Sequence, residues 1–274
     1  TLNKSSNIAL KRDFILEEFD YSYNMKADEL DLSILHKCTQ NKAISIFMQC
    51  HEGIHSGNIR EKLFHKIYSK GYKPLFYGAG RGGDVVLSYY GKRSGWFVDY
   101  RTEIINRDNK EYASLRDENI FKMPKIYITR TGNPFKAFYD KSNYASNNFF
   151  SLQFLNYIDN TEENLMYIFP FINSKICQYF IRTFAAPRLG STFVETKIIH
   201  LLKFPIPIVT DSTKKYIVKK VRDIINEREI GNDICEYDEE INGIIYKLYG
   251  LTYDEILIVD PQTLITREEY EKDK

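Results

Sequence analysis

The sequence predicts a mixed α/β (α+β) fold that ends in a helical hairpin. Short apolar runs between glycine and proline turns fill the chain up to about residue 209, and in 125–129 apolar residues alternate with a period of two, which is typical of strands. From residue 211 the apolar residues recur with a helical period, and a second helical stripe covers 238–249 before Gly250. We therefore expect a sheet followed by two antiparallel helices.

Composition indicates an ordinary globular chain. Of the 274 residues, 43% are hydrophobic and 27% are charged, with no run of about 18 apolar residues and no signal-peptide pattern. This argues against a membrane or secreted protein, so we expect a cytoplasmic one. The four cysteines (Cys38, Cys50, Cys177 and Cys235) lack CxxC spacing, which favours reduced, buried thiols over disulfides or zinc ligands. The chain opens without an initiator methionine, so we expect a part of a longer protein.

The charge is unevenly distributed although the net charge is only +1. Residues 60–203 carry 22 Lys and Arg against 13 Asp and Glu, a net charge of +9. Residues 1–59 carry 6 against 8 (−2), and residues 204–274 carry 10 against 16 (−6). A basic middle between acidic ends suggests a polyanion bound by the middle of the chain, while a simple solvated face remains the alternative.

The first 78 residues predict a helix, a strand and two loops. Residues 28–35 have the acidic first turn and apolar stripe of a helix, and 44–49 reads as a strand. Residues 51–58 contain two glycines, and we expect a loop whose backbone approaches a ligand. His51 and His55 have the spacing of a helical metal pair, but Gly53 argues against a helix and no third ligand follows, so we expect two surface histidines in a loop.

Residues 78–123 begin with a glycine-rich loop, Gly78-Ala79-Gly80-Arg81-Gly82-Gly83, that matches neither nucleotide-binding glycine pattern. We expect it to present Arg81. Strands are predicted at 85–90 and 96–100, joined by a turn at 91–95, and a polar helix near 111–118. Trp96 is expected in the core, with stacking on a base as the alternative.

Residues 124–144 predict an exposed hairpin with cations and aromatic residues at its tip. The alternation in 125–129 suits a half-buried strand, and Gly132-Asn133-Pro134 marks the turn before 135–139 return. An adenine-methyltransferase Asn-Pro-Pro-Tyr sequence is absent; Asn133-Pro134-Phe135 lacks its second proline and is interpreted as a turn. Nor does the chain contain GxSxG or a convincing nuclease pattern.

The remaining elements are predicted from caps and prolines. We expect a strand over 147–158, a helix from Thr161 that Pro170 interrupts, and a second helix capped at 173–175 that runs to Phe184. Residues 191–199 should be extended, and the prolines in 204–208 favour an edge strand. The charged tail from Pro261 is expected to fray.

Several short sequences, in this order, resemble the TaqI-like C-terminal specificity domain, the target recognition domain of adenine-N6 DNA methyltransferases and type IIG restriction-modification enzymes. The resemblance spans about residues 45–260 and leaves 78–119 unplaced, so it predicts no target sequence. The matching segments are Glu52-Gly53-Ile54-His55-Ser56-Gly57-Asn58, Lys73-Pro74-Leu75, Pro124-Lys125-Ile126, Arg130-Thr131-Gly132, Ile172-Asn173-Ser174-Lys175, Thr196-Lys197-Ile198, Phe204-Pro205-Ile206-Pro207, Ile241 to Gly250, and Leu251-Thr252-Tyr253-Asp254-Glu255-Ile256.

The resemblance implies a curved mixed β-sheet recognition domain at 44–209 with a C-terminal helical subdomain at 210–274. Residues 1–43 would connect it to an upstream methyltransferase domain of the same bacterial polypeptide. S-adenosylmethionine, the base-flipping pocket and Mg²⁺ for any fused nuclease would belong to that missing part. The chain itself would hold no cofactor or metal, would not be catalytic alone, and would bind double-stranded DNA.

Cations and amides near predicted loops are the candidate contacts with DNA. Lysines suit phosphates, a guanidinium suits the two acceptors on a guanine edge, and an asparagine amide suits adenine. The candidates are Lys66, Lys70, Lys92 and Lys141 for phosphates, Arg60, Arg81, Arg93, Arg130, Lys136 and Arg188 for guanine, and Asn58, Asn133 and Asn143 for adenine. The alternatives are a protein-protein interaction module and a nuclease with an unrecognised site.

Overall fold

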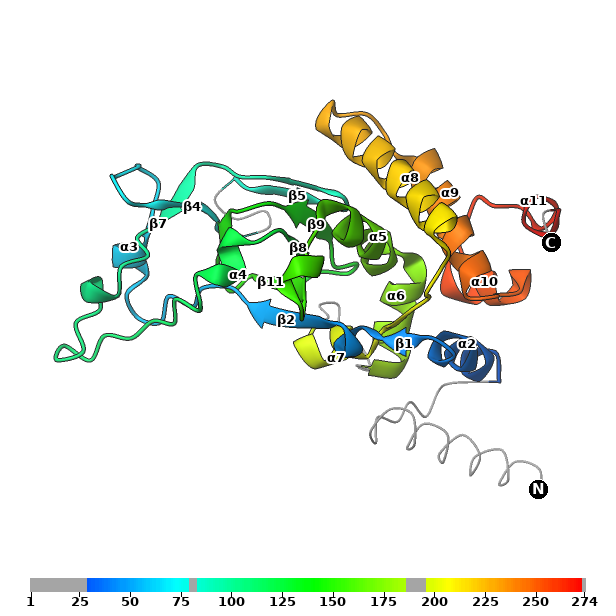
Figure 1. The fold of residues 1–274 in the computed structure, drawn as a ribbon, viewed down its shortest axis with the longest axis horizontal. Coiled ribbons are helices and arrows are strands. Elements are labelled where there is room, and N and C mark those ends of the chain that lie inside the picture. Colours follow the sequence, from blue (N-terminus) through cyan, green and yellow to red (C-terminus); the bar gives the residue numbers. More distant parts are fainter. Residues whose placement is uncertain (1–28, 79–82, 186–195, 273–274) are drawn as a thin grey trace, which may run out of the picture.

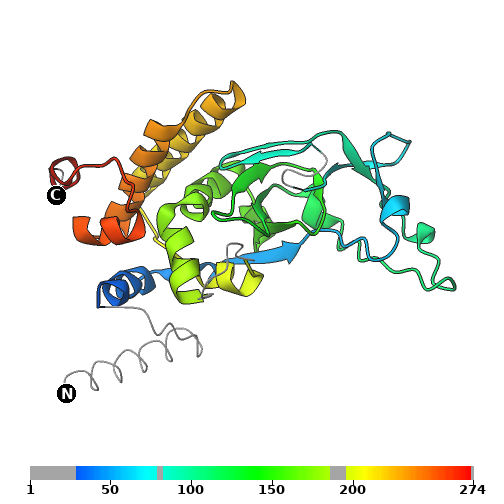
Figure 2. The ribbon, with the colours of Figure 1, turned by 180° about the vertical axis from the view of Figure 1, so that it is seen from behind.

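The computed structural model describes residues 29–78, 83–185 and 196–272, and confirms the mixed α/β class with C-terminal helices. Figures 1 and 2 show an elongated molecule with a small sheet at one end, a larger sheet in the middle and the C-terminal helices at the other end. The middle sheet therefore lies between the small sheet and the helical part.

The larger sheet is antiparallel, with the strand order β2-β11-β8-β9. Its strands are β2 (Met48–Glu52), β11 (Phe149–Phe154), β8 (Lys125–Thr129) and β9 (Ala137–Asp140). The rings of Phe76, Phe138 and Phe149 pack around Tyr127 on β8, with ring centroids 5.6–6.0 Å from it. Helix α5 (Glu162–Asn173) packs against β8 and β9, so this sheet lies within the main core.

The hairpin of β8 and β9 is confirmed, and its turn is exposed at Thr131, Asn133 and Pro134, but the prediction of a half-buried β8 is wrong. Lys125 pairs with Asp140 and Ile128 with Ala137, as expected for this turn. All five residues of β8 are buried, because β11 and β9 flank the strand and side chains cover both of its faces. The alternation of residue types along β8 therefore does not mark a solvent-exposed face of the strand.

The small sheet has the order β10-β4-β7-β3 and a hydrophobic cluster of its own. It contains β3 (Phe64–His65), β4 (Lys73–Phe76), β7 (Trp96–Val98) and β10 (Tyr144–Ala145), with only β10 and β4 parallel. Two short helices, α3 (Arg60–Leu63) and α4 (Asn119–Lys122), lie beside it. The ribbon of β5 (Val85–Leu87) and β6 (Tyr90–Lys92) extends from here to β9.

Buried polar groups hold the two sheets together. The Ser146 hydroxyl and the Asn148 amide both donate to the carbonyl of Tyr77, at the end of β4. The Lys125 ammonium, with no exposed area, donates to the carbonyls of Phe121 and Met123 and lies 3.2 Å from Asp140. Burial lowers the pKa of Lys125 to about 8, against the opposing effect of Asp140.

The C-terminal part is helical, and its hairpin of α8 (Asp211–Glu229) and α9 (Cys235–Leu248) is confirmed. Gly250 follows with a φ of 66°, as predicted for a residue just past a helix end. Helix α2 (Glu29–Thr39) packs on α10 (Tyr253–Val259), where Lys37 pairs with Glu255 at 2.6 Å. The other elements are α6 (Lys175–Phe180), α7 (Ile198–Lys203), α11 (Arg267–Glu271), β1 (Lys42–Ala43) and β12 (Pro205–Ile206).

Several predicted elements differ from the structure in their bounds. The strand expected from residue 44 begins at Met48, because 44–46 form a 3₁₀ turn, and it includes His51, which is therefore not in a loop. The strand expected over 85–90 breaks at Tyr89, whose φ is 69°. Residues 111–118 form no helix. Residues 198–203, partly expected to be extended, form α7; most of 191–197 lies outside the described residues.

Tertiary packing explains two further differences. Helix α5 continues through Pro170, where residues 165–172 are all buried, so packing offsets the hydrogen bond that proline removes. The tail does not fray over 267–271: α11 has a capping box, and the buried Tyr270 donates its hydroxyl proton to the carbonyl of Leu251.

The glycines of 51–58 bring the chain close to itself. A Cβ on Gly53 would lie 2.1 Å from the carbonyl oxygen of Ser146, and one on Gly57 would lie 1.9 Å from that of Tyr112. We expect Gly53→Ala to lower the free energy of unfolding by about 1–3 kcal/mol, because backbone atoms must move to admit the methyl group. Urea unfolding measures the change.

The matched control is Gly243→Ala within α9, where the nearest atom to a Cβ is the flexible Cδ1 of Ile265 at 3.1 Å. This change should be neutral or stabilising by up to about 1 kcal/mol. Equal effects of the two substitutions would contradict the close approach at Gly53.

The cysteines should differ in reactivity towards iodoacetamide at pH 8. Cys38 and Cys177 are fully buried, Cys50 is partly buried, and burial raises the pKa of all three thiols. Their thiolate fraction at pH 8 is therefore negligible, whereas Cys235 is exposed. Peptide mass spectrometry should find only Cys235 alkylated in the native protein and all four in urea. Native alkylation of Cys38 at a comparable rate would contradict the packing.

Candidate nucleic-acid interface

The carboxylate of Asp84 organises the small sheet's outer surface. Asp84 is 3% exposed, and its Oδ2 accepts hydrogen bonds from the backbone amides of Tyr77 (2.5 Å) and Gly78 (3.1 Å). Its Oδ1 accepts from the amide and the hydroxyl of Ser94, both at 2.7 Å. One buried carboxylate thus fixes the end of β4 to the segment that leads into β7.

This connection places two aromatic rings face to face. The rings of Tyr77 and Trp96 stack with centroids 4.2 Å apart and an interplanar angle of 16°. Phe64 on β3 packs edge-on against Tyr77 at 5.6 Å. Trp96 is only partly buried, so the prediction that it is plain core holds for one side of the residue.

Two exposed cations cover these rings. The Arg60 guanidinium lies 5.1 Å from the centroid of Tyr77, and the Lys66 ammonium lies 5.1 Å from that of Trp96. Arg60 is the first residue of α3, and Lys66 directly follows β3, so local structure brings both to the stack. We call Arg60, Tyr77, Trp96 and Lys66 the cation–aromatic column.

Three further candidates lie in the segments next to the column. Arg93 donates to the carbonyl of Trp96 at 3.4 Å, and burial lowers its pKa although Asp140 and Asp84 oppose this. Lys92 is exposed at the end of β6, and Lys70 is exposed in the turn between β3 and β4. The small sheet and the adjoining β5–β6 ribbon, with their connecting segments, therefore carry five of the thirteen predicted contacts.

Arg130 lies elsewhere, in a cluster at the end of β8. Its guanidinium is 3.5 Å from the Glu52 carboxylate and 5.9 Å from the centroid of Phe150. Arg116 shares the same carboxylate at 2.6 Å. This pairing holds Arg130 in place and partly neutralises it, so its assignment to guanine stays a prediction.

The turn of the β8–β9 hairpin packs against α6. Gln178 donates to the carbonyl of Phe135, and the exposed Asn133 lies beside Lys175 and Arg182 at a small hollow. Lys136 reaches across to the carbonyl of Val86 on β5 at 3.3 Å. The turn is thus supported by helix and ribbon, and its predicted DNA contacts stay predictions.

Two of the predicted asparagines already make hydrogen bonds within the protein. Asn58 donates to the carbonyl of Lys110 and accepts from the amide of Tyr112. Asn143 donates to Asp140, while its carbonyl accepts from the hydroxyl of Tyr127. Both residues therefore hold loops in place, in addition to any role at a base.

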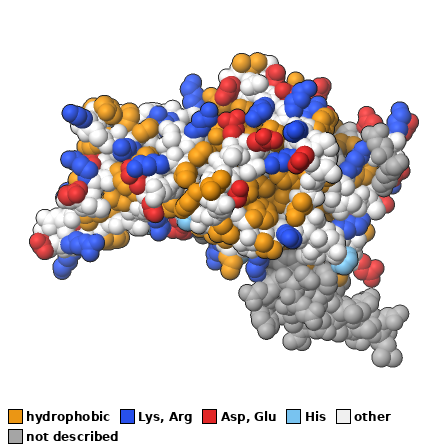
Figure 3. All heavy atoms as spheres, viewed as in Figure 1, with side chains coloured by type: hydrophobic (Ala, Val, Ile, Leu, Met, Phe, Trp, Pro, Cys, Tyr) orange, Lys and Arg blue, Asp and Glu red, His pale blue; other side chains and the backbone are white. Residues whose placement is uncertain are grey.

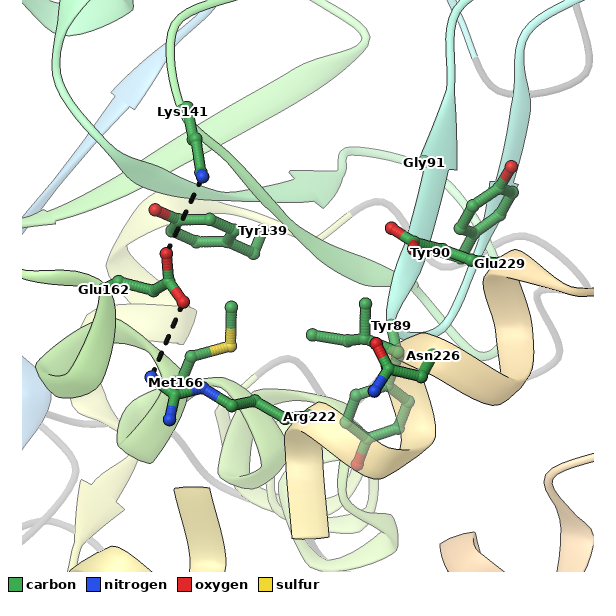
Figure 4. A pocket seen from close by; sticks show the side chains of 11 residues that line it. Tyr89, Tyr90, Gly91, Tyr139, Lys141, Glu162, Met166, Arg222, Asn226 and Glu229 are labelled. Carbon is green, nitrogen blue, oxygen red and sulfur yellow. Dashed lines mark ion pairs between the residues drawn. The ribbon is translucent and has the colours of Figure 1, made fainter. Parts of the chain in front are cut away.

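Lys141 lies on a different surface, at a hollow between β6, β9, α5 and α8 (Figure 4). It is 75% exposed and is 3.8 Å from Glu162, which also lies 3.5 Å from Arg222. Arg81 and Arg188, the other two candidates, lie outside the described residues.

Sequence reasoning missed Asp84 and Tyr77. The available signal was an aspartate directly after a glycine-rich loop, which is a frequent position for side-chain acceptors of turn amides. The stacking partner of Trp96 is 19 positions away in sequence and depends on strand pairing between β4 and β7. Only the fold shows this contact.

The described ranges offer no other obvious chemistry. Among them, no group of three or more His, Cys, Asp or Glu side chains is arranged to hold a metal ion. None of the helices in these ranges is both long and apolar enough to cross a bilayer. Figure 3 shows Lys and Arg side chains over the small sheet and also over α8.

Comparisons with known proteins agree with the resemblance inferred from the sequence. Residues 91–206 match the family described as the TaqI-like C-terminal specificity domain, which confirms that resemblance over this range. The match includes Lys92, Arg93 and Trp96 and begins inside the segment that the sequence motifs had left unplaced. Comparison with curated proteins gives no match.

Among solved structures, the type IIG restriction endonuclease BpuSI is similar, with 12% sequence identity and a TM-score of 0.48. The alignment covers 87% of this chain and 34% of that one. The present chain therefore spans about a third of that enzyme's length.

Replacing Asp84 tests whether its carboxylate aligns the two rings. In Asp84→Asn, an amide NH₂ group replaces an oxygen that accepts hydrogen bonds from backbone N–H groups. We therefore expect the free energy of unfolding to fall by about 1–3 kcal/mol. Because Trp96 is the only tryptophan, its fluorescence should also change in the folded variant. Asp108→Asn, at an exposed position, is the control and should change neither quantity. An unchanged Trp96 emission in Asp84→Asn would refute the alignment role.

Proposed function

We propose that this chain is the DNA target recognition domain of a restriction-modification enzyme, and that the small sheet carries part of its contact with double-stranded DNA. The cation–aromatic column is the observation that supports this proposal most directly. The family match over 91–206, which includes one ring of the column, supports it independently.

The column favours phosphate binding because it restricts two long cationic side chains before a ligand arrives. Arg60 and Lys66 each lie over a ring face, which limits their rotamers and reduces the entropy lost on binding. The cations keep their charge available, since they face rings and not carboxylates. Phosphate contacts from such side chains supply affinity and orient the protein on the duplex.

The same geometry favours duplex over single-stranded DNA. An unpaired base binds by stacking on an open aromatic face. Here the faces of Trp96 are occupied by Tyr77 and Lys66, and Arg60 lies over Tyr77. Base edges would instead be read by side chains near the column, with Arg93 as the best-placed guanidinium.

The finer features of the parent protein belong to the same proposal. We propose that catalysis resides in an upstream adenine-N6 methyltransferase domain of a bacterial, cytoplasmic polypeptide, with or without a nuclease. S-adenosylmethionine, and Mg²⁺ for a nuclease, would be bound there. This chain would supply sequence recognition and position the target base.

One observation favours an interaction module as a second function. Ile46 and Ile208 are 61% and 77% exposed and line an apolar groove of about 470 Å³ together with Phe47 and Phe154. Exposed apolar groups of this size are frequent at protein contacts. This groove is lined by residues of β1, α5, β12 and α8 and by none of the column, so both functions are compatible with one chain.

Binding to a randomised duplex pool, followed by fluorescence anisotropy from 50 to 200 mM salt, tests the DNA proposal. The wild type should bind with strong salt dependence and enrich a short sequence. Arg60→Gln with Lys66→Gln should reduce the slope of log K against log salt by up to about 2, because two phosphate contacts are lost.

The control has the same charge change at a remote position. Arg267→Gln with Lys272→Gln, on and just after α11, should leave the slope unchanged. Absence of wild-type binding to any duplex at 50 mM salt would reject the proposed function. Normal binding with an unchanged slope in the Arg60 and Lys66 variant would reject the column as its contact.

A further inference from the structure

The C-terminal part has a net charge of −6, yet the structure separates its charges by face. Helix α8 carries six cations, and two of them point away from its outer face: Lys220 pairs with Glu240 at 2.6 Å, and Lys214 donates to Asn164. Many of the acids belong to α9 and its neighbours. Averaging along the sequence therefore hides any basic surface in this region.

Three other cations form a stripe on the outer face of α8. At 100° per residue, positions 215, 219, 222, 226 and 229 fall within about 80° of one another. They carry Lys215, Lys219, Arg222, Asn226 and Glu229, all exposed. The first three place positive charges along about 10 Å of helix axis, given a rise of 1.5 Å per residue. We call these three residues the α8 stripe.

The stripe borders the hollow drawn in Figure 4. Arg222, Asn226 and Glu229 line one side of it, while Lys141 and Tyr139 approach from β9. Glu162 lies between Lys141 and Arg222 and is within 4 Å of both, so it orients two cations at the rim. The hollow is floored in part by Met166 and has a volume of about 340 Å³.

Strand β6 joins this surface to the candidate interface. Tyr90 and Gly91 line the hollow, and the next two residues are Lys92 and Arg93. A Cβ on Gly91 would lie 2.4 Å from the ring of Phe138, so β6 packs directly on β9 at this point. Lys92 and Arg93 therefore follow directly on the residues of β6 that line the hollow, and Arg93 donates to the carbonyl of Trp96 in the column.

We propose that the α8 stripe, with Lys141, is a second contact with the DNA phosphate backbone, outside the part of the duplex whose sequence is read. This inference rests on the proposed function. Its chemistry requires a polyanion with closely spaced charges, and each strand of a duplex presents one phosphate per 3.4 Å of axis. The ammonium groups of Lys215 and Lys219 suit phosphates, and the Arg222 guanidinium lies 3.5 Å from the Glu162 carboxylate, so we assign the stripe to the backbone and not to base edges. It therefore adds affinity and fixes the path of the duplex without adding specificity.

The test compares salt dependence and sequence preference in the whole chain. The variant Lys215→Gln, Lys219→Gln, Arg222→Gln should reduce the slope of log K against log salt by up to about 3 and leave the enriched sequence unchanged. On a short duplex that contains only the enriched sequence, wild type and variant should bind more equally. The difference should return when flanking base pairs are added.

The matched control removes three cations from other faces: Lys220→Gln, Lys247→Gln and Arg267→Gln, which contact Glu240, Tyr270 and Asp254. Its slope should equal that of the wild type. Glu162→Gln is a second variant, with an expected effect opposite to that of the stripe variant, because it removes the carboxylate between Lys141 and Arg222. It should raise affinity for duplex and steepen the slope.

The outcomes separate this inference from the function on which it rests. If the wild type binds duplex with a sequence preference but the stripe variant keeps the wild-type slope, the second contact is wrong and the recognition function stands. An equal loss in the control variant would also reject it, because the effect would then reflect total charge. If the wild type binds no duplex, both fail. Circular dichroism confirms that each variant is folded.

Discussion

The buried carboxylate of Asp84 is the constraint on which the candidate interface depends. It accepts from the backbone amides of Tyr77 and Gly78 at the start of the glycine-rich segment and from Ser94, so the end of β4 and the segment that leads into β7 are held together. Because the amides of Tyr77 and Ser94 are fixed, the rings of Tyr77 and Trp96 meet face to face. An apolar residue at position 84 would leave three amides without an acceptor, and the stack would lose its alignment.

The connection between the two sheets is equally polar and equally close. The carbonyl of Tyr77, whose amide is bound by Asp84, accepts from Ser146 and Asn148 at the start of β11. Gly53 lets the end of β2 pass against the carbonyls of Ala145 and Ser146, where a methyl group would not fit. Tyr77 is thus bonded both to Asp84 beside the column and to the segment that leads into the larger sheet. The surface that we propose for DNA is therefore attached to the larger sheet by backbone contacts and buried hydrogen bonds.

Local signals in the sequence were sufficient for the starts of α5 and α6, for the α8–α9 hairpin and for the fold class. Caps at Thr161 and Ser174, the stripe from residue 211 and the glycine at 250 are all where they were predicted. Exposure was not predictable, because alternation in β8 reflects two buried faces of different chemistry. The site was only partly predictable: Arg60, Lys66 and Arg93 were chosen as cations near loops, whereas their convergence depends on a strand pairing that no local pattern encodes.

The charge of a surface is likewise not predictable from the sum of charges along the sequence. A sum over residues 204–274 is negative, but α8 directs Lys220 toward Glu240 and leaves Lys215 and Lys219 on another, exposed face. Electrostatic attraction of a polyanion depends on the local arrangement, since charges beyond about 8–10 Å are screened at physiological salt. The acids of α9 therefore weaken a phosphate contact on the α8 stripe less than their number suggests. Glu162 acts at contact distance, which makes it the acid with the greatest influence on that surface.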